Sequence, residues 1–272
     1  FILAALAAFR YNVGYDFQTY RRSYELSQRF MGNFMEMASR IHFEWGYLFL
    51  MWIAPNFRVL IILCAAVAVT LKMAYIKKET DARLVCIIMY FMGIFLPYDM
   101  GIVRQGISIA ILLYSIKYAI NKDVVKFGLL IMLACLFHVT ALLFIPMYFI
   151  ANHKYTKRQY YIVAGLSLVL FICVRAEVVV NVARLIPIEL VQTKVLYYAT
   201  IYRADDLEHI TYITMIKRIL VLIMFVEWLS KTRENNDDKT IFYLNAYTLS
   251  IFILGLCGDL NAIFGGRAIQ SL

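Results

Sequence analysis

MGIVRQGISIAILLYSIKYAI, residues 100–120, is long and apolar enough to cross a lipid bilayer, yet Arg104, Gln105 and Ser108 lie within it. A guanidinium at membrane depth costs at least a few kcal/mol, so such a residue usually faces a partner, an aqueous cavity or an anionic ligand. Similar polar insertions recur along the chain, at Arg10, Asp16, His138, Asp259 and Arg267. The sequence therefore predicts a membrane protein with a polar interior site.

The composition predicts an all-α protein. Hydrophobic residues make up 62% of the chain and charged residues 17%, whereas a soluble domain has nearer to a quarter of its residues charged. The apolar residues come in blocks, which excludes an outer-membrane barrel with its two-residue period and leaves a polytopic helical bundle. We expect one integral membrane domain over residues 1–272, cut from a longer protein at both ends, because the first apolar run resembles the second half of a helix.

The net charge of +9 is typical of membrane proteins that carry Lys and Arg in their cytoplasmic loops. The sequence has no Lys- and Arg-rich tail, so no nucleic-acid partner is predicted. The five cysteines lie in apolar runs and form no CxxC motif, and we interpret them as small buried hydrophobes.

The apolar runs and basic loops predict the topology. Spans or helix fragments are expected at residues 1–9, 45–54, 57–76, 84–98, 99–120, 160–174, 211–230 and 241–257. Placing the short basic loops in the cytoplasm puts two polar segments, 10–44 and 175–210, outside. This arrangement favours a hairpin of two short arms within residues 127–150, turning near 138–140, but one ordinary span there is the alternative.

Three polar sites offer chemistry, each with a structural alternative. Arg10 sits where the first helix ends, and Asp16 is its partner or a base; both could instead anchor the chain at the interface. Arg104 could snorkel to the surface, but Ser108 and Ser115 share its helix face, which favours a wet inward face. His138 is either a core residue or a neutral imidazole able to take a proton. Its surroundings lack HxxxH and HExxH, so no metal site is predicted.

Four segments together resemble the EpsG family of bacterial exopolysaccharide polymerases, which are related to the Wzy-type O-antigen polymerases. They are RYNVGYDFQTY at 10–20, EWGYLFL at 44–50, VRQGISIAILLYSIKYAI at 103–120 and LFHVTALLFIPMY at 136–148. The Gly-Gly-Arg ending at Arg267 is similar to a polar Arg motif near the family's C-terminal end. Tyr15 departs from the small hydroxyl residue expected there.

The resemblance implies a GT-C-like, metal-independent glycosyltransferase without a cofactor, multi-pass in the bacterial cytoplasmic membrane with its active site toward the outer face. Its substrate would be a polyprenyl-pyrophosphate-linked oligosaccharide. Membrane lipid, and proteins of polysaccharide export or chain-length control, are the other expected partners.

The resemblance also implies residue roles. Arg104 and Arg10 would clamp the pyrophosphate, with Arg267 as a third candidate. Either Asp16 or His138 would deprotonate or orient the acceptor hydroxyl. Hydrogen bonds to sugar or phosphate would come from Gln105 and Tyr20. The outer segments would form a sugar groove, in which Tyr197, Tyr198 and Tyr202 stack on sugar rings or form an interfacial belt.

Two other functions use the same residues. A transporter or flippase of a lipid-linked or anionic substrate could hold it with the buried arginines, but the inverted repeats common in transporters are absent from the sequence. A membrane-bound sugar acyltransferase could use His138 as its base, but the sequence around His138 offers no acidic partner or second histidine.

Overall fold

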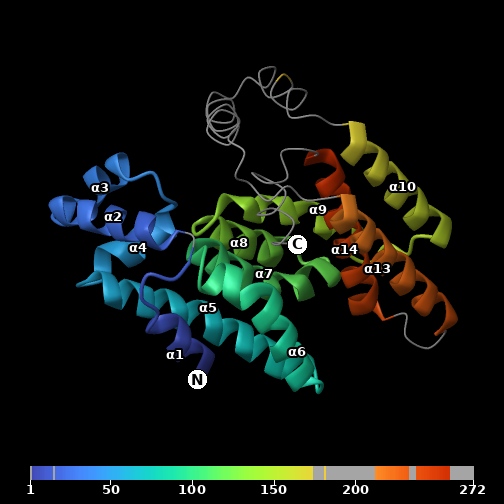
Figure 1. The fold of residues 1–272 in the computed structure, drawn as a ribbon, viewed down its shortest axis with the longest axis horizontal. Coiled ribbons are helices and arrows are strands. Elements are labelled where there is room, and N and C mark those ends of the chain that lie inside the picture. The colour runs from blue at the N-terminus through green and yellow to red at the C-terminus, as the bar shows by residue number, and fades with distance from the viewer. Residues whose placement is uncertain (1, 15, 174–180, 182–211, 233–236, 258–272) are drawn as a thin grey trace. The chain divides into compact units, whose positions relative to one another are not determined.

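The computed structural model describes residues 2–14, 16–173, 181, 212–232 and 237–257, and every regular element in these ranges is a helix (Figure 1). This confirms the all-α prediction for the described part of the chain. The chain divides into two compact units, Phe1–Ile145 and Pro146–Leu272.

The first unit joins short helices in its N-terminal part to longer apolar helices. In order they are α1 (Ile2–Ala8), α2 (Phe17–Ser27), η1 (Gln28–Phe30), α3 (Phe34–Arg40), α4 (Trp45–Ile53), α5 (Phe57–Glu79), α6 (Arg83–Tyr90), η2 (Phe91–Asp99), α7 (Val103–Ile120), α8 (Val124–Cys135) and η3 (Val139–Phe144), and α9 (Ile145–Ile150) begins at the unit boundary. The polar segment 10–44 thus contains short helices.

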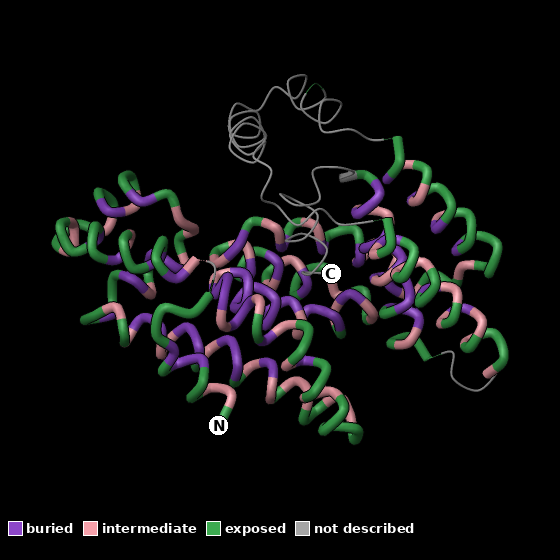
Figure 2. Tube along the Cα trace, in the orientation of Figure 1, coloured by how far each residue is buried: buried purple, intermediate pink, exposed green. Residues whose placement is uncertain are grey.

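Helix α5 is central to the first unit. It starts after Pro55, and the Asn56 side chain caps it by accepting a hydrogen bond from the Val59 N–H at 3.0 Å. Helices α1 and α7 both pack against it, and Figure 2 shows buried residues along α5 and α7. Its buried face includes Cys64, Ala65 and Ala68, small residues that let helix backbones approach closely in a membrane.

The prediction for residues 84–98 needs one refinement. The helix does not stop at Pro97 but widens into the π-helix η2, in which the Met100 N–H donates to the Phe95 carbonyl at 2.9 Å. A wide turn accommodates a proline that has no N–H to donate. Because the π-helix continues to Asp99, the Asp99 side chain is buried inside the unit.

Residues 124–144 form a hairpin rather than one span. Helix α8 ends at Cys135, His138 adopts an extended conformation, and η3 follows. The rings of Phe127, in the first turn of α8, and Phe144, at the end of η3, stack with centroids 6.4 Å apart. The chain therefore returns along α8, and of the two alternatives left open by the sequence the structure has the hairpin.

The second unit packs α14 (Asp238–Cys257) against α10 (Lys157–Cys173) and α13 (Tyr212–Lys231). Its core includes Phe171, Leu222 and Ile251. A Cβ on Gly255 would lie 2.5 Å from the Ser167 carbonyl oxygen, so this position of α14 fits against α10 only without a side chain.

Within the described ranges, two helical stretches are long and apolar enough to cross a membrane, Phe57–Glu79 and Asp238–Leu256. Large apolar side chains are also exposed on other helices, among them Leu6, Met89 and Met224. Such surfaces are expected where helices face lipid rather than water. Several predicted features lie outside the described residues: Tyr15, the outer segment 175–210 apart from residue 181, with Tyr197, Tyr198 and Tyr202, and the stretch that contains Asp259 and Arg267.

Candidate functional site

Arg104 lies in the first turn of α7 and faces the N-terminal polar segment. Its Nη1 donates to the Glu44 carboxylate, which directly precedes α4. The guanidinium carbon lies 4.3 Å from the Phe43 ring centroid, 5.7 Å from that of Tyr20 and 6.0 Å from that of Tyr47. Arg104 is thus held by a carboxylate and by aromatic faces that attract a cation, and it does not snorkel outward.

Arg10 comes to the same place from the end of α1. Its side chain is buried, and Nη1 donates to the Asp99 main-chain carbonyl at 2.6 Å. Arg10 and Arg104 both lie close enough to Tyr20 and Tyr47 for their charges to interact with these side chains. The two guanidinium groups predicted to work together therefore lie near one pair of tyrosines.

Several donors in this cluster have no protein partner within the described part of the chain. They are Arg10 Nε and Nη2, Arg104 Nε and the Tyr47 hydroxyl, all buried. Buried polar groups are nearly always hydrogen-bonded, and leaving one unpaired costs about 1–3 kcal/mol. Three of the four belong to guanidinium groups and can only donate. The arrangement therefore suits a ligand rich in acceptor oxygens.

A second, fully buried group of residues supports the first. Lys72 Nζ lies 2.5 Å from Asp99 Oδ1 and donates to the Gly106 carbonyl at 2.8 Å, and the Tyr90 hydroxyl donates to Asp99 Oδ2. Lys72 neutralises the Asp99 carboxylate, so only the main-chain carbonyl of Asp99 meets Arg10. The positive charge of Arg10 therefore remains available to an anion.

Asp16 and Tyr20, at the start of α2, form one side of the arginine cluster. Asp16 precedes the helix, and the Tyr20 hydroxyl donates to its Oδ2 at 3.3 Å. Burial raises the pKa of Tyr20, which keeps the phenol protonated and able to donate. Gly14 (φ +110°) turns the chain against the loop before α7, where a Cβ would lie 2.1 Å from the Met100 carbonyl oxygen. A residue other than glycine would both clash and be strained there.

His138 lies at the tip of the hairpin, and the tip reaches the start of α4. The Gly46 N–H donates to the Leu136 carbonyl at 2.7 Å, and a Cβ on Gly46 would lie 2.7 Å from the same oxygen. His138 Nδ1 caps η3 by accepting from the Thr140 N–H at 3.3 Å, and it lies 2.7 Å from Thr140 Oγ1. The tip of the hairpin, which carries His138, is therefore joined through Leu136 to the start of α4, two residues after Glu44.

Comparison with known proteins identifies the family of the chain. A family model described as the EpsG family matches residues 1–269. The chain belongs to the EpsG family. This confirms the resemblance, and EpsG is a family of exopolysaccharide polymerases that are membrane proteins. No curated protein and no solved structure matches the chain.

Of the residues predicted for this EpsG site, the structure places Arg10, Asp16, Tyr20 and Arg104 around one cluster. Gln105 is buried beside Arg104 in α7, and His138 lies at the hairpin tip in the same unit. The predicted third arginine, Arg267, lies outside the described residues. The described ranges contain no group of three or more His, Cys, Asp or Glu residues placed to hold a metal ion.

Sequence reasoning missed Lys72 and did not connect Glu44 with Arg104. Lys72 interrupts an apolar run just as Arg104 does. Because burying a charge is costly, its position in the sequence could have identified it as a functional or paired residue. The partner of each cation could not be found in the same way, because Asp99 and Glu44 lie in other elements.

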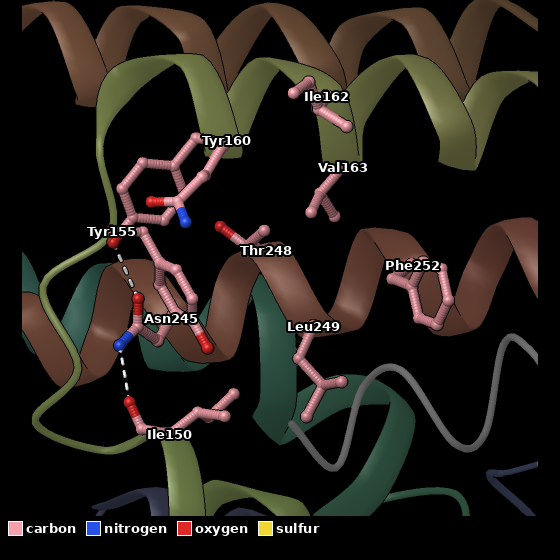
Figure 3. A pocket seen from close by; sticks show the side chains of 10 residues that line it. Ile150, Tyr155, Tyr160, Ile162, Val163, Asn245, Thr248, Leu249 and Phe252 are labelled. Atoms are coloured by element: carbon pink, nitrogen blue, oxygen red, sulfur yellow. Dashed lines mark hydrogen bonds between the residues drawn. The ribbon is translucent and has the colours of Figure 1, made fainter.

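The second unit of this EpsG chain contains a pocket of about 400 Å³ between α10 and α14 (Figure 3). Its lining is mainly apolar, and the side chain of Asn245 in it is already engaged. Asn245 Oδ1 accepts from the Tyr160 hydroxyl at 2.7 Å, and Nδ2 donates to the Ile150 and His153 carbonyls at 2.7 and 3.0 Å. These contacts stabilise the helix packing and point to no chemistry, so the arginine cluster is the better candidate site.

Proposed function

We propose that this EpsG family protein is a glycosyltransferase that joins polyprenyl-pyrophosphate-linked oligosaccharides into a polysaccharide. The observation that carries the proposal is that Arg10 and Arg104 lie near the same pair of tyrosines, Tyr20 and Tyr47, and that several buried donors of this cluster lack partners among the described residues. A diphosphate supplies the acceptor oxygens and the negative charge that these groups are suited to bind.

The guanidinium groups fit the chemistry of a diphosphate leaving group. Each is a planar fork that can bind two phosphate oxygens at once. As the bond between the sugar and the diphosphate breaks, negative charge grows on the diphosphate. Fixed cations at that position stabilise the transition state more than the ground state, which raises the rate. In this proposal Arg10 and Arg104 supply that charge without a metal ion.

The position of the cluster suits an amphiphilic substrate. The arginines lie where the polar segment 10–44 meets the apolar helices α1, α5 and α7. A polyprenyl chain could remain in lipid along those helices while the sugars extend over the polar segment. We place this end at the outer face of the bacterial cytoplasmic membrane, and we assign Arg267 as a third phosphate ligand. Proteins of export or chain-length control would act on the product.

The acceptor side of the site has its own candidates. Tyr20 and Gln105 are assigned to hydrogen bonds with sugar or phosphate, and Asp16 to a hydrogen bond that orients the acceptor hydroxyl. His138 is assigned to the acceptor hydroxyl or a neighbouring oxygen, because the hairpin tip lies at the start of α4.

Arg104→Ala and Arg104→Lys test the proposal. We expect purified wild-type protein to lengthen a lipid-linked oligosaccharide, and Arg104→Ala to lower the rate by about 100-fold or more. Lysine keeps the charge but not the fork, so Arg104→Lys should recover only part of the rate. Arg21→Ala, an exposed arginine paired with Glu25, is the matched control. Wild-type polymer from both Arg104 variants, at equal membrane levels, would remove Arg104 from the mechanism.

A further inference from the structure

We propose that Glu44 is the catalytic base, which takes the proton from the acceptor sugar hydroxyl. The inference rests on the proposed glycosyl transfer and assigns to it a residue that the sequence motifs left without a role. It starts from the pairing of Glu44 with Arg104, the cation expected to bind the leaving diphosphate.

The side chain of Glu44 is turned toward the site rather than toward its own helix. Glu44 is the residue before α4, yet its side chain makes no capping hydrogen bond. Asn33, Asn56 and Asp123 occupy the same position before other helices, and their side chains do cap them. Glu44 gives up this stabilisation and pairs with Arg104 while its side chain stays 20% exposed. It is therefore held in the site and remains reachable by a substrate.

A carboxylate beside a diphosphate site needs an explanation, because two anions repel each other. Without substrate, Glu44 neutralises Arg104. When the diphosphate binds, its oxygens compete for the same guanidinium and displace the carboxylate. Glu44 then lies next to the reacting sugar without its cationic partner. Substrate binding thus releases the base at the moment when it is needed.

The geometry of His138 favours a carboxylate as the base. Its Nδ1 is engaged by Thr140, because it accepts from the Thr140 N–H at 3.3 Å and lies 2.7 Å from Thr140 Oγ1. This nitrogen therefore belongs to the cap on η3. We assign His138 to a hydrogen bond with a substrate oxygen rather than to the role of the base.

The other carboxylates are less suitable than Glu44. Both oxygens of Asp99 are engaged, by Lys72 and Tyr90, and its side chain is fully buried. Asp16 accepts a hydrogen bond from Tyr20. Within the described residues, the carboxylate paired with Arg104 is that of Glu44.

The step balances without a further reactant. The acceptor hydroxyl oxygen forms a bond to the anomeric carbon, and its proton goes to the Glu44 carboxylate. The bond from that carbon to the diphosphate oxygen breaks, and its electron pair leaves with the polyprenyl diphosphate, bound by Arg104. Glu44 then releases its proton to water, and the carboxylate can pair with Arg104 again.

The test compares Glu44→Gln with Glu25→Gln, an exposed carboxylate of α2, as the matched control. Binding of sugar-free polyprenyl pyrophosphate and the turnover of lipid-linked oligosaccharide are measured separately on the full protein in detergent. Glutamine keeps the shape but cannot take a proton. We expect Glu44→Gln to bind the probe at least as tightly as wild type, because Arg104 loses a competing anion, and its kcat to fall about 100-fold or more. Glu44→Asp should recover part of the rate, and Glu25→Gln should match wild type.

Three results would overturn the inference. Turnover by Glu44→Gln within about threefold of wild type would show that no base is missing. A parallel loss of probe binding and turnover would make Glu44 a structural partner of Arg104. A loss confined to kcat in Asp16→Asn, with Glu44→Gln active, would assign the base to Asp16. Failure of the wild-type protein to lengthen the oligosaccharide would instead contradict the proposed function itself, so the two failures can be told apart.

Discussion

Lys72 and Asp99 form an ion pair buried between α5 and the end of η2, with 2.5 Å between Nζ and Oδ1. The main-chain carbonyl of the same Asp99 accepts the hydrogen bond from Arg10. One residue therefore joins the buried charge pair to the candidate diphosphate site. We infer that this pair fixes the peptide to which Arg10 is bound, and that its integrity controls how well Arg10 is placed.

Removing one charge of this pair should destabilise the protein strongly. In Asp99→Asn, Lys72 stays buried without a counter-charge, and breaking a buried pair in this way costs about 3–5 kcal/mol. We expect little folded protein in detergent, measured by size-exclusion chromatography and thermal unfolding. The double variant Lys72→Met with Asp99→Asn removes both charges and should recover much of the folded fraction. Normal folding of the single variant would show that the pair is not needed.

The hairpin tip should depend on a glycine. In Gly46→Ala the new Cβ would meet the Leu136 carbonyl oxygen, so the tip that carries His138 must shift. We expect oligosaccharide turnover to fall while the protein remains folded. Gly128→Ala is the matched control, because a Cβ there meets nothing within 4 Å and alanine favours a helix by up to about 1 kcal/mol. Equal turnover in both variants would argue against a role for the tip.

Substitutions at His138 can separate its role as the N-cap of η3 from a role in glycosyl transfer. Asparagine is a good N-cap and can replace Nδ1 at the start of η3, but it has no imidazole Nε2. We expect His138→Asn to fold like wild type and its turnover to fall about 10-fold or more. In His138→Ala the cap is also lost, so the free energy of unfolding should fall by about 1 kcal/mol. Unchanged turnover in His138→Asn would limit His138 to the cap.

Arg10 and Arg104 should act as a unit. If both bind one diphosphate, their effects on substrate affinity are coupled, and the double variant Arg10→Ala with Arg104→Ala should lose less than the two single losses combined. A double-mutant cycle on the dissociation constant for lipid-linked oligosaccharide measures this coupling. Strict additivity would mean that the two arginines bind separate groups.

The sequence predicted individual site residues where a charged side chain lies in an apolar run, because burying a charge costs free energy and therefore indicates a function. Arg10 and Arg104 stood out for that reason, and the long apolar runs correctly predicted α5, α7, α10, α13 and α14. Lys72 follows the same rule but was overlooked beside Lys77 and Lys78, which mark the end of the helix. Asp99 and Glu44 could not be paired with their cations, because these contacts join residues distant in sequence.

The sequence alone could not decide between a hairpin and one span at residues 127–150. An apolar run does not show whether one helix continues through it or whether the chain turns back. The turn at His138 depends on the side chain capping η3 and on the Leu136 carbonyl meeting Gly46, and both interactions need the folded chain. The role predicted for Arg267 stays a prediction.

The most direct test of the arginine site is the binding of polyprenyl diphosphate and polyprenyl monophosphate to purified protein in detergent, at one ionic strength. The wild-type protein should bind the diphosphate more tightly, and Arg10→Ala and Arg104→Ala should each reduce that preference, with Arg21→Ala unchanged. Equal affinity of the wild-type protein for the two lipids, or a preference that survives the loss of both arginines, would contradict the account.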